Sequence, residues 1–218
     1  MEIRWMTHSW FQIKAGKATV HVDPSAPDSR FPEGLVRGAE KAGLVLITHH
    51  HADHCRKEIL DAVSKEGAGV LAPSACADRL GRGMIAMKPG DAYQFGDLAV
   101  RAVHSYNTPG GASTVKAHRR GECLGYLLTS GGRTIYHAGD TDLIAEMGSL
   151  GPVDAALLPI GGTYTMDVRE AAEAVERIKP KVVVPMHYLD ANPEDFRNWV
   201  GKRAKVVVLK PGEAFSLA

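Results

Sequence analysis

The segment ITHHHADHC, residues 47–55, holds four of the ten histidines of the chain and one aspartate. His49 and His51 are two residues apart, so their side chains can point the same way in an extended segment. Asp53 and His54 follow, where a helix is expected to begin. Imidazole nitrogens and carboxylate oxygens bind Zn²⁺ at about 2.0–2.2 Å. Four such groups in so short a segment exceed what one tetrahedral site can accept, which predicts two neighbouring metal ions.

Further ligand-type residues stand at the ends of other apolar runs. The run GLVLITHH predicts a buried strand that leads into the histidines. His104 ends LAVRAVH, Asp140 ends RTIYHAGD and His187 ends VVVPMH. Strand ends on one edge of a sheet converge on one surface, which is where sites in α/β proteins form. We therefore expect these three residues to complete the metal centre.

The remaining pattern alternates short strands with helices. Hairpins are expected between HSWFQIK and KATVHVD, within 91–105 and within 124–140. Helical spacing predicts helices within 52–65, 165–180 and 192–203, and Asp167 is the predicted N-cap of the second. The segment 205–218 is expected to finish the sheet. A faint symmetry of two halves, each with a buried strand ending in histidine, favours one domain, residues 1–218, with two sheets inside and helices outside.

The composition excludes several classes of protein. The chain has 44% hydrophobic residues, a net charge of +1 and no long basic run, so no nucleic-acid partner is expected. Its longest apolar stretches are about five residues, against the ~20 of a membrane-spanning helix. We predict no signal peptide and no membrane association. Three cysteines without a C-x-x-C pair favour a reducing, cytoplasmic location. The expected partner is a small-molecule substrate, and a homo-oligomer is left open.

The motifs taken in order resemble those of the metallo-β-lactamase-fold hydrolases. They are H-x-H-x-D-H after a buried strand, a lone histidine, G-D-T and P-M-H-Y. The resemblance runs from Ile3 to Ala218. ALLPIGGTYTMD and EAVERIKPKVVVPMHY are especially similar to a metal-dependent hydrolase branch near the ascorbate-6-phosphate lactonase-like proteins. The resemblance implies an α/β fold, a four-layer αββα sandwich.

The resemblance also implies which residues hold the metals. The implied ligands are His49, His51 and His104 for the first metal, Asp53, His54 and His187 for the second, and Asp140 as a bridge between both. Asp53 and Asp140 are the candidate catalytic residues, because a bridging carboxylate fixes the metal spacing and can relay a proton. Zn²⁺ is favoured over Mn²⁺ and Fe²⁺, although nitrogen and oxygen ligands discriminate poorly among these ions.

Such a centre implies hydrolysis. Two ions about 3.5–4 Å apart share a water and lower its pKa towards 7. The predicted protein is a metal-dependent hydrolase that uses a dinuclear metal-bound hydroxide on a small ester, lactone or phosphodiester. One alternative is a metallo-nuclease or phosphodiesterase acting on nucleic acid, which the balanced charge disfavours. The other is a non-catalytic metal-bound scaffold or sensor.

Four residues are candidates for substrate contact. His8 opens the first strand pair, and its counterpart in the similar branch often lies near the metals. His118 lies in the loose segment 105–121, where the alternative is a solvated loop residue. Tyr164 precedes a helix N-terminus that suits an anion, with an ordinary capping turn as the alternative. Tyr188 directly follows the last ligand and is expected to line the pocket.

Overall fold

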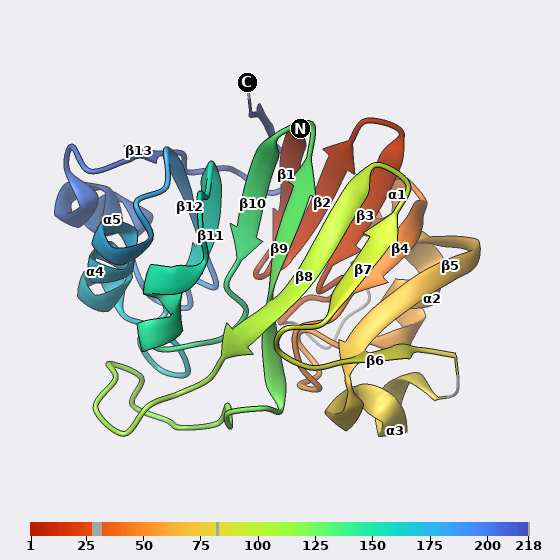
Figure 1. Ribbon diagram of the computed structural model, residues 1–218, viewed down its shortest axis with the longest axis horizontal. Helices are drawn as coiled ribbons and strands as arrows, with labels where there is room; N and C mark the ends of the chain where they lie inside the picture. The colour runs from red at the N-terminus through yellow and green to blue at the C-terminus, as the bar shows by residue number, and fades with distance from the viewer. Residues whose placement is uncertain (28–31, 82, 218) are drawn as a thin grey trace.

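Two stacked β-sheets form the centre of the molecule (Figure 1). The computed structural model describes residues 1–27, 32–81 and 83–217. The strands of the first sheet are β1 (Glu2–Thr7), β2 (Trp10–Ala15), β3 (Ala18–Val22), β4 (Ala42–Leu46), β5 (Ser64–Pro73), β6 (Ile85–Met87) and β14 (Ala214–Ser216). Those of the second sheet are β7 (Ala92–Phe95), β8 (Leu98–Ser105), β9 (Cys123–Ser130), β10 (Arg133–His137), β11 (Ala155–Pro159), β12 (Val182–Met186) and β13 (Lys205–Val206). In space the orders are β14-β1-β2-β3-β4-β5-β6 and β13-β12-β11-β10-β9-β8-β7.

The main core lies between the two sheets. Phe11 and Leu44 of the first sheet belong to the same apolar cluster as Tyr126 and Leu157 of the second, and all four are fully buried. The alternation of side chains along each strand turns one face of each sheet into this core. The opposite faces are left for the helices to cover.

Helices cover both outer faces. The helical segments are α1 (Glu33–Gly38), α2 (Lys57–Val63), η1 (Ser74–Cys76), α3 (Ala77–Leu80), η2 (Ala145–Ser149), α4 (Val168–Ile178) and α5 (Pro193–Val200). Ile59 of α2 packs with Trp10 on the first sheet, and Phe196 of α5 packs with Tyr136 on the second. Figure 1 shows α4 and α5 on one side of the sheets and α2 and α3 on the other. These layers confirm the predicted αββα sandwich.

The local sequence signals predict several elements correctly. Strands β2 and β3 pair around Gly16, from Phe11 opposite Val22 to Ala15 opposite Ala18. The hairpins β7–β8 and β9–β10 also form where they are expected. The Asp167 side chain accepts a hydrogen bond of 2.8 Å from the backbone N–H of Glu170, as predicted for the cap of α4. In the described part of the chain, the helices are too short or too polar to cross a membrane.

Two segments differ from the prediction. Helix α2 spans Lys57–Val63: it begins after the predicted start near Asp53 and His54, and it ends before residue 65 because the backbone becomes extended at Ser64 and continues as β5. The C-terminal segment was expected to finish one sheet, but it contributes to both. Strand β13 pairs with β12, whereas β14 pairs with β1 of the other sheet.

Candidate metal centre

Segments from both sheets meet at one edge of the sandwich. Their histidine nitrogens and carboxylate oxygens form three groups, within each of which the ligand atoms lie within 4.8 Å of one another. The first group is His49, His51 and His118, and the second is His8, Asp53, His54 and His187. The third, of Asp23, His49 and His54, overlaps the other two. The second group joins the turn after β1 and the loop after β4 to the end of β12. The strand ends therefore converge as the sequence predicts, but the residues that meet there are not all those that were predicted.

Asp140 connects the first and second groups. Its Oδ2 lies 3.0 Å from His187 Nε2, 3.5 Å from His54 Nε2 and 3.5 Å from His118 Nε2. The side chain is 2% exposed, and burial alone would raise its pKa. The charges of His187 and His54 reverse this effect and hold the pKa well below its ordinary value. An ionised carboxylate thus stands between the groups.

Gly139 allows the chain to place Asp140. Its φ of +64° lies in the left-handed region, and a Cβ there would lie 2.6 Å from the Leu124 carbonyl oxygen. Only glycine avoids both the strain and the clash. The G-D pair of the sequence motif therefore has a steric cause.

In the first group, hydrogen bonds fix which nitrogen carries the proton on two of the rings. Thr48 Oγ1 donates to Asp23, so its oxygen accepts from His49 Nδ1 at 2.9 Å. His118 Nδ1 faces two acceptors, Asn107 Oδ1 at 3.1 Å and the Tyr164 carbonyl at 3.2 Å. Nδ1 therefore carries the proton on both rings, and each Nε2 has a free lone pair.

The three imidazoles of the first group are neutral at pH 7. Burial is the main reason why the pKa of His49 lies well below the ordinary value, that of His118 is lowered and that of His51 falls to about 4. His118 Nε2 lies only 3.2 Å from His51 Nδ1. Neutral nitrogens gathered in this way can act as ligands for a metal ion.

The orientation of His54, in the second group, depends on Asp23, which was not among the predicted site residues. Asp23 is buried and accepts from His54 Nδ1 at 2.8 Å, and also from the backbone N–H and hydroxyl of Thr48 at 2.7 and 2.6 Å. Burial lowers the pKa of His54, but Asp140 and Asp23 together raise it well above its ordinary value. The site therefore attracts positive charge at His54 Nε2. One feature could have indicated the role of Asp23. It directly follows β3, which runs parallel to β4 with Val22 opposite Leu46, so Asp23 lies beside the segment that follows β4.

His8 holds Asp53 in the second group. Its Nε2 lies 3.2 Å from Asp53 Oδ2, and its ring centre lies 3.9 Å from that of His187. Burial opposes ionisation of Asp53, yet the hydrogen bond from His8 and the charge of His54 leave its pKa lowered. His8, Asp23 and His187 all have φ near +50°, a strained conformation for residues other than glycine. Such strain persists where the surroundings over-determine it, often at functional sites.

The residues present fit bound metal. His49 Nε2, His54 Nε2 and Asp140 Oδ1 are buried, and none has a hydrogen-bond partner among the described residues. An unpaired buried polar atom costs about 1–3 kcal/mol. Divalent cations bound between the groups would satisfy all three atoms. The set of imidazoles and carboxylates is of the type that zinc accepts.

The centre opens to solvent through a mouth of about 310 Å³. This mouth is lined by His51, Asp53, Ala117, His118, Asp140, Tyr164 and His187. Tyr164 is 41% exposed and stands where a substrate contact is expected. Tyr188 does not line the mouth; its ring packs 5.2 Å from that of Trp5.

The structure corrects the place of His104. Its ring lies 6.2 Å from that of Tyr106, and it lines a separate hollow with Arg101 and Glu146. Strand β9 lies between β8 and β10, so the ends of β8 and β10 are about 10 Å apart across the sheet. His118, from the loop after β8, takes the place in the first group that the sequence analysis assigned to His104.

A model of the β-lactamase superfamily domain matches residues 2–187. The chain belongs to the β-lactamase superfamily. Within this superfamily, it is 35% identical over 232 residues to a UPF0173 metal-dependent hydrolase of Thermococcus kodakarensis, and 35% identical over 229 residues to one of Pyrococcus furiosus. Both alignments cover 100% of each chain. The chain is thus a member of this family of metal-dependent hydrolases.

Solved structures of proteins about 30% identical to this chain have the same fold. A metallo hydrolase from Ignicoccus hospitalis superposes with a TM-score of 0.80 at 30% identity, covering 100% of this chain and 99% of the other. A protein from Parabacteroides distasonis superposes with a TM-score of 0.84 at 31% identity, covering 94% and 91%.

Proposed function

We propose that this metal-dependent hydrolase holds two divalent ions, preferentially Zn²⁺, and cleaves a small ester, lactone or phosphodiester. One observation carries the proposal: two groups of ligand-type atoms share the buried carboxylate of Asp140 at the base of one open mouth. Membership of the superfamily supports metal-dependent hydrolysis. The shared carboxylate supports two ions over one.

The geometry favours a specific division of ligands. We assign His49, His51 and His118 to the first ion, Asp53, His54 and His187 to the second, and Asp140 to both. When bound, such a pair of ions supplies Lewis acidity and an activated water as the nucleophile. Asp140 lies at the base of the mouth, where its carboxylate can accept a proton from the nucleophile.

Residues behind the ligands set their orientation. Asp23 fixes the proton of His54 on Nδ1, and the Thr48 hydroxyl does the same for His49. His8 donates to Asp53 and so keeps that carboxylate turned towards the second group. Partners of this kind fix the tautomer and ring orientation of metal ligands. We therefore assign His8 to positioning.

The size of the mouth favours a small substrate. Its volume of about 310 Å³ is at the lower end of the range of about 300–1,000 Å³ for small-molecule sites. Tyr164 and Ala117 also line it. The net charge of +1 gives a polyanionic nucleic acid no general attraction. A lactone, a short ester or a small phosphodiester fits these limits.

Metal analysis combined with a substrate panel tests the proposal. The protein is reconstituted with Zn²⁺ or Mn²⁺, its metal content is measured, and lactones, esters, phosphodiesters and thioesters are assayed with and without chelator. We expect about two ions per chain and hydrolysis that disappears with the metal and returns on its addition. Asp140→Asn should lose at least 100-fold in kcat, because both groups depend on this carboxylate.

Two results would overturn this function. Hydrolysis that survives complete metal removal contradicts the metal mechanism. Two tightly bound ions without turnover of any member of the panel would support the scaffold alternative instead.

A further inference from the structure

Exposed apolar side chains gather on the loops around the metal centre. In the described part of the chain five large apolar side chains are exposed, and Ile85 of the edge strand β6 is one of them. The other four lie on α5 and on the loops after β8, β11 and β12: Val115, Tyr164, Leu189 and Trp199. The loops after β8 and β12 also carry His118 and His187. Exposed apolar residues that gather at one place mark a binding surface, whereas scattered ones do not.

Two of these loops run side by side at the mouth. The backbone N–H of Val115 donates to the Thr163 carbonyl at 2.7 Å, and the Asn107 side chain donates to the Tyr164 carbonyl at 2.9 Å. Val115 therefore lies beside the residue that precedes Tyr164. Tyr164 in turn lines the mouth, so the exposed apolar surface begins at the metal centre itself.

The loop after β12 packs against the same loop after β11. A Cβ on Gly161 would lie 3.2 Å from the Leu189 side chain and 2.6 Å from the His187 carbonyl oxygen, so only glycine permits this approach. Trp199 lies further out, and the Arg169 guanidinium carbon lies 4.7 Å from the centre of its ring. That charge covers one face of the indole. The apolar rim of the mouth is therefore defined by Val115, Tyr164 and Leu189.

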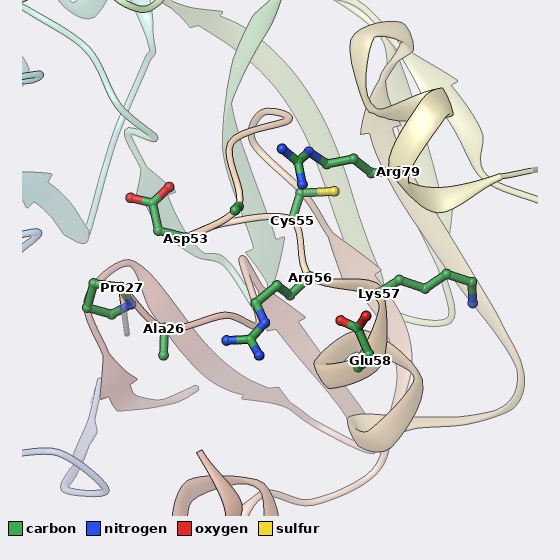
Figure 2. Close-up of a pocket in the computed structure, with 9 residues that line it drawn as sticks. Ala26, Pro27, Asp53, Cys55, Arg56, Lys57, Glu58 and Arg79 are labelled. Atoms are coloured by element: carbon green, nitrogen blue, oxygen red, sulfur yellow. The ribbon is translucent and has the colours of Figure 1, made fainter. Parts of the chain in front are cut away.

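Beyond Asp53 the surroundings of the mouth are charged. Asp53 lines both the mouth and a neighbouring hollow of about 480 Å³. Figure 2 shows the charged side chains that line this hollow, which are Arg56, Lys57, Glu58 and Arg79. Charged groups retain their water because desolvation is costly. An apolar group of a substrate therefore gains more by lying on the apolar rim than by lying in this hollow.

The position of Tyr164 favours an occupant that arrives with the substrate. A protein that covered the apolar rim permanently would also close the mouth, because Tyr164 belongs to both. A substrate that enters the mouth covers the apolar rim only while it is bound. Part of the substrate, and not a partner chain, therefore fits this surface.

We propose that the apolar rim binds an uncharged alkyl or aryl group of the substrate while the bond to be cleaved lies at the metal centre. This inference rests on the proposed function, because it names the substrate class of the same site. The mouth of about 310 Å³ takes the reacting group, and the apolar group lies outside it. The preferred substrates then carry an apolar chain or ring on one side of the bond to be cleaved.

Binding of a neutral apolar dye tests the apolar rim without turnover. Nile red, which fluoresces in apolar surroundings, is titrated into the zinc-reconstituted protein and displaced with 1-butanol, 1-hexanol and 1-octanol. A methylene removed completely from water strengthens binding about fourfold, and the rim covers one side of the chain. We therefore expect the dye to bind, and displacement to strengthen roughly twofold with each added methylene.

Three substitutions locate this binding. Tyr164→Ser and Val115→Ser should each weaken binding of the dye and of 1-octanol roughly 5-fold, because apolar area is lost. Ile85→Ser is the matched control and should leave binding unchanged. It removes a similarly exposed apolar side chain from β6, which Figure 1 shows on the opposite side of the molecule from α5. Circular dichroism of each variant establishes that it is folded.

Turnover of an ester series supplies a second measurement. For phenyl acetate, phenyl butanoate and phenyl octanoate, kcat/KM of the wild type should rise with the length of the acyl chain. Tyr164→Ser should flatten this rise, whereas Ile85→Ser should preserve it. A purely structural role of Tyr164 would lower all three values by the same factor.

Equal affinity of the wild type and Tyr164→Ser for the dye and for 1-octanol would overturn the proposal. A stable dimer in sedimentation that dissociates in Tyr164→Ser would also overturn it, because the apolar rim would then belong to a second copy of the chain. Both results leave the hydrolase proposal standing, since that proposal is tested by metal dependence. Conversely, absence of turnover counts against the hydrolase proposal and leaves the measured dye binding in place.

Discussion

The histidines at the base of the centre commit one ring nitrogen to an oxygen of the protein and keep the other for a ligand. Thr48 holds His49, Asp23 holds His54 and Asn107 holds His118. In each case the held atom is Nδ1, so Nε2 faces the centre. Loss of such a partner typically weakens metal binding 10- to 100-fold. Substitution of single residues can therefore test the identity of each ligand.

His118→Ala and His104→Ala distinguish the two candidates for the first group. We expect His118→Ala to lose about one metal ion per chain and at least 100-fold in kcat, because no other described residue joins His49 and His51. His104→Ala should retain both ions and most activity. Metal content and turnover on the best substrate of the panel measure these effects. A normal metal content in His118→Ala, with loss in His104→Ala, would restore the assignment made from the sequence.

His21 should make the stability of the protein dependent on pH. It is buried, Trp10 Nε1 donates to its Nδ1 at 3.0 Å, and its Nε2 faces the Glu40 carbonyl at 2.9 Å. Burial lowers its pKa from 6.5 to about 4, against the weaker effect of that carbonyl. Between pH 6.5 and 4 the unfolded state binds a proton that the native state does not. The stability is therefore complete above pH 6.5 and falls by up to about 3 kcal/mol towards pH 4.

Comparison with His21→Gln isolates this effect, because the other histidines titrate in both proteins. The free energy of unfolding is measured by chemical denaturation of metal-free protein at several pH values. We expect the advantage of the wild type over His21→Gln to shrink as the pH falls. A difference that is constant from pH 7.5 to 4 would contradict the assignment.

The loop between β8 and β9 takes its shape from one buried side chain. Asp142 accepts from the backbone N–H of Thr108 at 2.8 Å and of Ser113 at 3.1 Å, and Lys116 lies 3.1 Å from it. A Cβ on Gly111 would lie 2.2 Å from its Oδ2, so the loop packs closely on the carboxylate. This loop carries His118 to the first group.

Asp142→Asn should loosen the loop between β8 and β9. The amide has one acceptor oxygen in place of two and no charge for Lys116, so we expect a loss on the order of 2 kcal/mol in stability. Amide hydrogen exchange in residues 107–118 should increase, and the first metal should bind more weakly. Glu146→Gln is the control, since Glu146 contacts the same loop at Tyr106 and Arg120, nearer to solvent. Unchanged exchange in Asp142→Asn would show that the loop is held by other contacts.

On the scale of the whole molecule, the centre joins the two sheets. His8 and His49 come from the first sheet, whereas Asp140 and His187 follow strands of the second. The His187 backbone N–H also donates to the His8 carbonyl at 3.2 Å across this edge. Metal bound here ties the sheets together in the native state alone. It should therefore stabilise the fold through mass action.

Metal addition should raise the melting temperature. At a free metal concentration of 100 times Kd the gain is about 2.7 kcal/mol, which corresponds to roughly 5–10 °C for a chain of this length. Calorimetric scans of chelated and reconstituted protein measure the shift. His187→Ala should reduce it. An equal shift in wild type and His187→Ala would place the stabilising ion elsewhere.

The sequence by itself determined the sandwich and most of the centre. Periodicity placed the strands, and residues at strand ends such as His49, Asp140 and His187 meet because the parallel strands of both sheets end at the same edge of the sandwich. The hairpin turns and the cap of α4 were predicted from short stretches of sequence in the same way. The hairpins and the cap depend on residues close together in the chain, and the position of each strand end depends on the pattern of its own run.

Only the tertiary structure decided the places of His118, His8 and Asp23. His118 reaches His51 through a loop without regular structure, and the sequence separation in that contact is 67 residues. Asp23 follows β3 and reaches His54, which lies after the neighbouring strand β4, 31 residues away. The contact of His118 leaves no periodic pattern, because an irregular loop follows no repeat and the path of this loop is set by a distant side chain, Asp142. His104 has the right residue type at the end of a strand, but its neighbours in space decide that it faces a different hollow.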